Sequence, residues 1–254
     1  MRRIFFNFLI CFIAVFYAEL NAEEHNGSPE DLFYKSNKLF KENRYSEAIK
    51  SYLELIESGQ RSGHLYYNLG NAYFHLNMIG HTILYYEKAY LLIPRDADLN
   101  YNLRYARQQT KDITEETQSF ISMTFFWLNS VTLGETILIF IIINVIFWTF
   151  LILRLYFKEE WSYYLLIILL IVWILSGASL GLKYYKVQLD NRAVILPKEI
   201  NVLSGPDSND TILFKLHAGT IVYLERDEDN WRLISLPDKK RGWVKSDSLG
   251  IIKF

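Results

Sequence analysis

Two long apolar runs separated by four residues constrain this chain more than any other feature. The runs cover Thr136–Tyr156 and Trp161–Leu182. Each is long enough to cross a hydrocarbon core of about 30 Å, because an α-helix rises roughly 1.5 Å per residue. The four residues between them allow only a tight turn, so the sequence predicts two transmembrane helices, 136–156 and 161–182, that form a hairpin. Both ends of a hairpin lie on one side of the membrane, and the flanking polar segments must therefore share a compartment.

The N-terminus has the layout of a secretory signal peptide. Met1–Arg3 is positive, Ile4–Ala18 is almost unbroken apolar sequence, and polar residues follow. This favours a signal peptide over residues 1–22, with cleavage after Ala22 or, as second choice, after Ala18. The alternative is an uncleaved anchor, for which about 15 apolar residues are short. A signal peptide and two spans predict a bacterial cytoplasmic (inner) membrane protein whose soluble domains are periplasmic.

Composition and charge exclude several classes of function. The net charge is −1, so no global basic field indicates a nucleic-acid partner. The single cysteine, Cys11, lies inside the predicted signal peptide, and the mature chain would have no thiol for a disulfide or a metal site. The histidines lack the close pairing with other ligands that zinc needs, and no phosphate-binding glycine loop is present. We therefore expect no metal and no cofactor.

Residues 29–112 repeat with a period of 34. Asn37 recurs as Asn71 and Tyr52 recurs as Tyr86. This period is the signature of tetratricopeptide (TPR) repeats, which are pairs of helices that stack into a solenoid. A third helix over 96–110 is expected to cap two such repeats. Because about three repeats are usually needed for stability, we expect a partner, self-association or the hairpin to complete the array.

The inner helices of these repeats predict a recognition groove. An asparagine at the shared position can bond the backbone of an extended peptide, although asparagine is also simply common at that position. Aromatic side chains are expected to line the same concave face. The predicted groove residues are Phe33, Asn37, Tyr67, Asn71, Phe74 and Tyr101.

Two short segments flank the predicted hairpin. Residues 120–131 are aromatic and too short to span, which favours an interfacial segment at the headgroup level. The alternative, that they pack on the helical cap, is nearly as strong. Residues 183–192 are polar and are expected to be a linker.

Residues 193–252 change to short β-type runs with turn residues between them. Five or six strands in about 60 residues predict a small barrel. The turns Ser204-Gly205-Pro206 and Gly242-Trp243-Val244 resemble those of bacterial SH3-like (SH3b) domains. We expect Trp231 and Trp243 to belong to its surface.

One motif suggests a hydrolase, but its context does not. Gly177-Ala178-Ser179-Leu180-Gly181 matches the nucleophile elbow, which requires a sharp strand-to-helix turn and a nearby histidine. Here it lies inside an apolar helix, where Gly177 and Gly181 fit the small-residue spacing for close helix packing. Asn144, near the middle of the first run, is expected to hydrogen-bond across helices. No catalytic residue is predicted, and the chain is expected not to be an enzyme.

The order of these parts resembles BatE-type proteins of bacterial aerotolerance operons. The segments Asp96–Arg107 and Leu213–Gly219 are also similar to that family. The resemblance implies a multidomain membrane protein with an all-α TPR solenoid, a two-helix transmembrane hairpin and an all-β SH3-like barrel. It also implies a role in stress tolerance, with membrane proteins carrying von Willebrand factor A domains, other Bat-type proteins and a MoxR-type AAA+ ATPase as partners.

Two functions follow from this reading. The first is a non-enzymatic, membrane-anchored scaffold or adaptor whose two soluble domains bind proteins. The second is an envelope anchor or sensor whose SH3-like domain binds cell-wall peptide or glycan.

Overall fold

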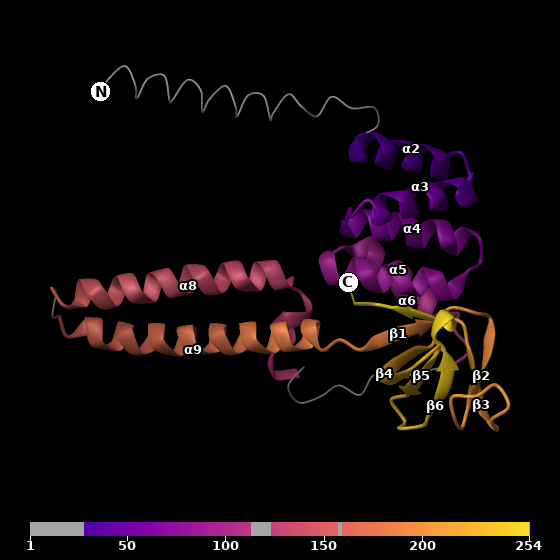
Figure 1. The fold of residues 1–254 in the computed structure, drawn as a ribbon. Helices are drawn as coiled ribbons and strands as arrows, with labels where there is room; N and C mark the ends of the chain where they lie inside the picture. The colour runs from indigo at the N-terminus through magenta and orange to yellow at the C-terminus, as the bar shows by residue number, and fades with distance from the viewer. Residues whose placement is uncertain (1–27, 113–122, 157–158, 254) are drawn as a thin grey trace, which may run out of the picture. The chain divides into compact units, whose positions relative to one another are not determined.

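The computed structural model describes residues 28–112, 123–156 and 159–253 (Figure 1). The chain divides into two compact units, residues 1–60 and 61–254. The predicted signal peptide lies outside the described residues, as do the first three residues of the predicted interfacial segment.

The first unit contains a helical hairpin, α2 (Pro29–Lys41) and α3 (Tyr45–Glu57). The Ser28 hydroxyl caps α2 by accepting a 3.2 Å hydrogen bond from the Asp31 backbone N–H. Asn43 has a φ of 61°, a left-handed conformation that asparagine tolerates and that ends the helix. The two helices bury one apolar face between them.

The second unit begins with three helices, α4 (Gly63–His75), α5 (Ile79–Leu92) and α6 (Ala97–Gln108). Asn77, with a φ of 58°, occupies the same left-handed turn position as the asparagine 34 residues earlier. An added Cβ at Gly70 would lie 2.5 Å from the Tyr86 ring, so only glycine allows α4 and α5 to approach this closely. Local structure therefore repeats with the period read from the sequence.

Two helices, α8 (Leu133–Arg154) and α9 (Trp161–Gln188), are long and apolar enough to cross a membrane. Their 22 and 28 residues correspond to lengths of about 33 and 42 Å. They pack side by side, with the Phe147 and Trp173 rings stacked at 5.4 Å. In the most apolar stretch of each helix, only 11% and 6% of the residues are buried, so α8 and α9 are not core helices of a soluble domain.

Both helices extend beyond the predicted spans. Thr132 and Glu135 form a reciprocal capping box, which starts α8 three residues early. The predicted linker over 183–192 is wrong for its first half, because α9 continues to Gln188. Residues 183–188 contain neither proline nor glycine, so nothing stops the helix at the end of the apolar run.

The C-terminal part is an antiparallel sheet of seven strands, with the order β3-β2-β6-β5-β4-β1-β7. Its alternating apolar side chains form one core, which includes Val202, Val222 and Ile234. The strand missed by the sequence analysis is the last, which is only three residues long and pairs with β1. The strands are β1 (Arg192–Ile195), β2 (Glu199–Leu203), β3 (Ile212–His217), β4 (Ile221–Glu228), β5 (Trp231–Ser235), β6 (Arg241–Lys245) and β7 (Leu249–Ile251).

The sheet packs directly against α5, and glycines make the approach possible. An added Cβ at Gly80 would lie 2.5 Å from the Ile195 carbonyl oxygen. One at Gly250, in β7, would lie 2.5 Å from the Leu84 side chain. The helical part of the second unit and the sheet are therefore in backbone-level contact.

Candidate binding sites

The first candidate site is the α4–α6 face, formed by Tyr67, Asn71, Phe74, Tyr101, Asn102 and Tyr105. The Tyr86 hydroxyl donates a 2.6 Å hydrogen bond to Asn71 Oδ1. Asn102 Nδ2 donates to the Tyr67 hydroxyl at 2.9 Å and to Asn71 Oδ1 at 3.5 Å. Polar groups on three helices, α4, α5 and α6, are thus joined in one network beneath the face.

Aromatic rings project from this face. The Phe74 and Tyr105 rings lie 5.9 Å apart. Tyr101 and Tyr105 are one helical turn apart on α6 and are 63% and 48% exposed. The sequence analysis missed Asn102 and Tyr105, although the i, i+4 spacing of the two tyrosines was a usable signal.

Burial decides the protonation of two hydroxyls in the network. It raises the pKa of Tyr86 well above its usual range and also raises that of Tyr67, whose hydrogen bonds with Asn71 and Asn102 lower it to a smaller extent. Both hydroxyls therefore remain protonated. Tyr86 is a donor to the Asn71 amide oxygen, and that oxygen is already used inside the fold.

The other two predicted groove residues lie in the first unit, where the same arrangement recurs. Asn37 Oδ1 accepts a 2.7 Å hydrogen bond from the Tyr52 hydroxyl. The Phe33 ring lies 6.2 Å from the Tyr52 ring. The expected bond from these asparagines to a bound peptide stays a prediction, and the observed partners of both asparagines include a tyrosine 15 positions later in the chain.

The two tryptophans of the sheet differ in exposure. Trp243 is only 6% exposed, and the Arg226 guanidinium lies 4.9 Å from its ring centroid. Trp243 is therefore a buried residue of β6 and not the surface residue that we expected, because neighbouring side chains such as Arg226 cover its ring. Trp231 is half-buried, with Lys245 Nζ 6.0 Å from its ring centroid. Of the pair, Trp231 offers the more accessible ring.

The predicted packing residues of the hairpin also differ. An added Cβ at Gly177 would meet the Phe140 ring at 3.5 Å, whereas one at Gly181 would meet nothing within 4 Å. Gly177 therefore faces α8. At Gly181 the surrounding space is open, because none of the described residues would contact a Cβ there. Asn144 is half-buried in α8, and Ser179 lies within α9.

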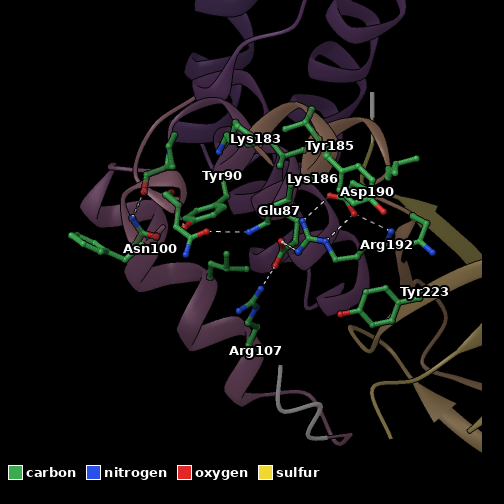
Figure 2. Close-up of a pocket in the computed structure, with 18 of the residues that line it drawn as sticks. Glu87, Tyr90, Asn100, Arg107, Lys183, Tyr185, Lys186, Asp190, Arg192 and Tyr223 are labelled. Atoms are coloured by element: carbon green, nitrogen blue, oxygen red, sulfur yellow. Dashed lines mark hydrogen bonds and ion pairs between the residues drawn. The ribbon is translucent and has the colours of Figure 1, made fainter. Parts of the chain in front are cut away.

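A carboxylate connects the helices to the sheet at a large pocket (Figure 2). Glu87 of α5 is 1% exposed and forms ion pairs with Arg107 of α6 and, at 3.3 Å, with Arg192 of β1. Arg192 also pairs with Asp190 at 2.8 Å. A buried carboxylate requires such compensating charges. The pair of Glu87 with Arg192 also joins segments about 100 residues apart. No local sequence signal could have indicated this cluster.

The C-terminal end of α9 forms hydrogen bonds in the same region. Lys183 Nζ donates a 2.7 Å hydrogen bond to the Leu128 carbonyl oxygen, and Lys186 Nζ donates a 3.0 Å bond to Asn129 Oδ1. Glu135 of α8 pairs with Arg95, between α5 and α6. Polar contacts therefore connect α8 and α9 to residues 128–129 and to the segment between α5 and α6.

A second carboxylate connects the end of the helical part to the sheet. Asp112 accepts hydrogen bonds of 2.7 Å from the His217 backbone N–H and from Thr220 Oγ1, and it lies 3.0 Å from His217 Nδ1. Burial raises the pKa of Asp112, but these hydrogen bonds outweigh it, and the pKa lies below its usual value.

Comparison with known proteins characterises the C-terminal sheet. Residues 197–249 match the family model described as Bacterial SH3 domain. The match confirms the predicted bacterial SH3-like domain, and it begins after β1, the strand that follows α9. No curated protein matches the sequence. The fold and the match together define a chain with two apolar helices of membrane-spanning length followed by a bacterial SH3-like domain.

Proposed function

We propose that this protein is a non-enzymatic, membrane-anchored scaffold or adaptor that holds two binding modules together on one side of a membrane. The observation that carries the proposal is the backbone-level contact of α5 with β1 at Gly80. Because the sheet also follows α9 directly, partners bound to the helices and to the SH3-like domain would be held in a fixed relation at the base of the hairpin.

We infer that the helical modules are TPR repeats. Supporting this are the left-handed turns at Asn43 and Asn77 and the paired bonds of Asn37 with Tyr52 and Asn71 with Tyr86. The proposed partners follow from the resemblance to BatE-type proteins. They are membrane proteins with von Willebrand factor A domains, other Bat-type proteins and a functionally linked MoxR-type ATPase that act together in stress tolerance.

The proposed topology places both soluble parts in the periplasm. It rests on the predicted signal peptide and on the two apolar helices. Alkaline phosphatase is active only outside the cytoplasm, so fusions at Thr110 and Lys253 should both be active. An inactive fusion at either position contradicts the topology.

The exposed aromatic rings of the α4–α6 face supply the binding test. Truncating one aromatic anchor at an interface centre typically costs about 2 kcal/mol or more. The double variant Tyr101→Ser with Tyr105→Ser should therefore reduce co-purification of membrane partners by at least about tenfold. Tyr34→Ser, which changes a 73% exposed tyrosine on α2, is the control and should retain capture. Full capture by the folded double variant would rule out this face.

The family match favours a second function, an envelope anchor or sensor that binds cell-wall peptide or glycan through the SH3-like domain. Trp231 is the more accessible of the two tryptophans on that domain. If this function holds, the detergent-solubilised chain should sediment with purified sacculi, and Trp231→Ala should weaken sedimentation. A chain that stays in the supernatant leaves the scaffold as the better explanation.

The non-enzymatic assignment has its own test. Ser179 lies in the middle of α9 and not on a strand-to-helix turn. A serine-directed phosphonate probe should leave it unmodified in membranes. Labelling that Ser179→Ala removes would establish a hydrolase instead.

A further inference from the structure

The pocket at the base of the hairpin has the composition of a lipid headgroup site. Its volume is about 1140 Å³, and its walls come from α5, α6, η1 (Phe126–Asn129), α9, β1 and β4. Typical ligand sites have volumes of about 300–1,000 Å³, so this pocket has room for a bulky group.

The pocket has an excess of positive charge. Five cationic side chains line it against two carboxylates, Glu87 and Asp190. The carboxylates form ion pairs with Arg107 and Arg192. The remaining cations are Arg104, Lys183 and Lys186. The two lysines donate hydrogen bonds to a carbonyl oxygen and an amide oxygen, and neither of these acceptors carries a charge. The net charge of the lining therefore suits an anion.

A membrane crossed by α9 would have its surface at the level of the pocket. The apolar part of α9, residues 161–182, is about 33 Å long, which already exceeds a hydrocarbon core of about 30 Å. The last turns of α9 must then emerge at the headgroup level, on the side of the soluble domain. These turns carry Tyr184 and Tyr185, whose rings favour the headgroup level, and Lys183 and Lys186, whose long side chains place their charged ends there.

One wall of the pocket is apolar and open to its surroundings. Met123 and Phe126 line it and are 63% and 68% exposed. A site with cations on one side and exposed apolar side chains on the other matches a lipid, whose phosphate and glycerol carry acyl chains. A soluble anion would make no use of the apolar wall.

We propose that this pocket binds the headgroup of an anionic phospholipid from the membrane that the hairpin crosses. Lys186 and Arg104 contact the phosphate, while Met123 and Phe126 contact the first part of the acyl chains. The bound lipid fixes how deeply the hairpin sits in the membrane and fills the space between α9 and the helices α5 and α6. This inference rests on the proposed membrane location of the hairpin, which alkaline extraction of the same membranes tests separately.

Native mass spectrometry of the full chain, released from mixed micelles of phosphatidylglycerol and phosphatidylcholine, tests the proposal. We expect the protein to retain phosphatidylglycerol selectively. The variant Arg104→Gln with Lys186→Gln changes two exposed cations and should lower retention by about 25-fold, because each cation near an anionic surface contributes roughly fivefold. The control Lys198→Gln with Lys240→Gln removes the same charge outside the pocket lining and should retain the lipid.

Equal retention by the two variants, or no preference for phosphatidylglycerol, would overturn the proposal. Glycerol 3-phosphate in solution distinguishes the source of the phosphate. If it displaces the lipid at equal concentration, the site binds a soluble phosphate and the lipid assignment is wrong. A photoactivatable phosphatidylglycerol on the unmodified chain gives a measurement that needs no variant. Crosslinks at Met123, Phe126 or Lys186 support the site, and crosslinks confined to the middle of α8 contradict it.

Discussion

Asn71 Oδ1 accepts a hydrogen bond of 2.6 Å from the hydroxyl of Tyr86, and Asn37 accepts one of 2.7 Å from Tyr52, at positions 34 residues earlier. Tyr86 is only 1% exposed. The asparagine is therefore part of the interior of its helix pair as well as a residue of the predicted groove. This dual position changes what a substitution at Asn71 would report.

Asn71→Ala should lower the free energy of unfolding, by about 1–3 kcal/mol, because it leaves the buried Tyr86 hydroxyl without its acceptor. The measurement is thermal or urea unfolding of the full chain in detergent. Adding Tyr86→Phe should recover much of the loss, since the orphaned hydroxyl is then removed. If the double variant is no more stable than Asn71→Ala, the bond contributes little.

Gly80→Ala should destabilise the contact between α5 and the sheet by about 1–3 kcal/mol, because the new Cβ would overlap backbone carbonyl oxygens of Ile195 and Leu196. Hydrogen exchange of β1 amides should become faster. Gly134→Ala is the matched control, since a Cβ there meets nothing within 4 Å. Unchanged exchange in Gly80→Ala would mean that the two parts are not held together at this point.

Acid should weaken the Asp112 connection. Its pKa is lower in the folded chain than the usual value of about 3.9, so the ionised carboxylate stabilises the fold fully above about pH 4, and this stabilisation is lost as the pH falls through the folded pKa. Asp112→Asn should therefore unfold at a lower temperature than the unmodified chain at pH 7, with the difference shrinking toward pH 3. Asp247→Asn, at an exposed position, should change little at either pH. A difference for Asp112→Asn that persists at pH 3 would contradict the electrostatic explanation.

Gly177→Leu should loosen the hairpin by about 1–3 kcal/mol, because a Cβ there already touches the Phe140 ring at 3.5 Å and the rest of the leucine side chain needs further space. Gly181→Leu should leave the stability of the isolated protein unchanged, since that position has open space around it. Thermal unfolding in detergent separates the two. Loss of partner co-purification in a stable Gly181→Leu variant would show that a partner helix packs there, whereas equal destabilisation by both changes contradicts this geometry.

Local signals in the sequence were sufficient to predict the two apolar helices and the C-terminal sheet. The lengths of the apolar runs predicted two helices of spanning length, and the short runs separated by turns predicted the antiparallel sheet that matches Bacterial SH3 domain. These signals work because helix length, side-chain alternation and turn chemistry depend on neighbours in the chain. The boundaries were less accurate, since α9 continues to Gln188 where no residue breaks it.

Only the tertiary structure decided how the parts of the second unit meet. The pairing of Glu87 with Arg192, the contact of Gly80 with Ile195 and the bonds of Asp112 with Thr220 each join residues about 100 or more positions apart. Such contacts depend on which faces remain uncovered after the elements form. The sequence by itself determined the presence of the helices, the repeat period and all strands but the short β7. The burial of Trp243, the roles of Asn37 and Asn71 and the pocket of Figure 2 arise only when the folded elements pack against one another.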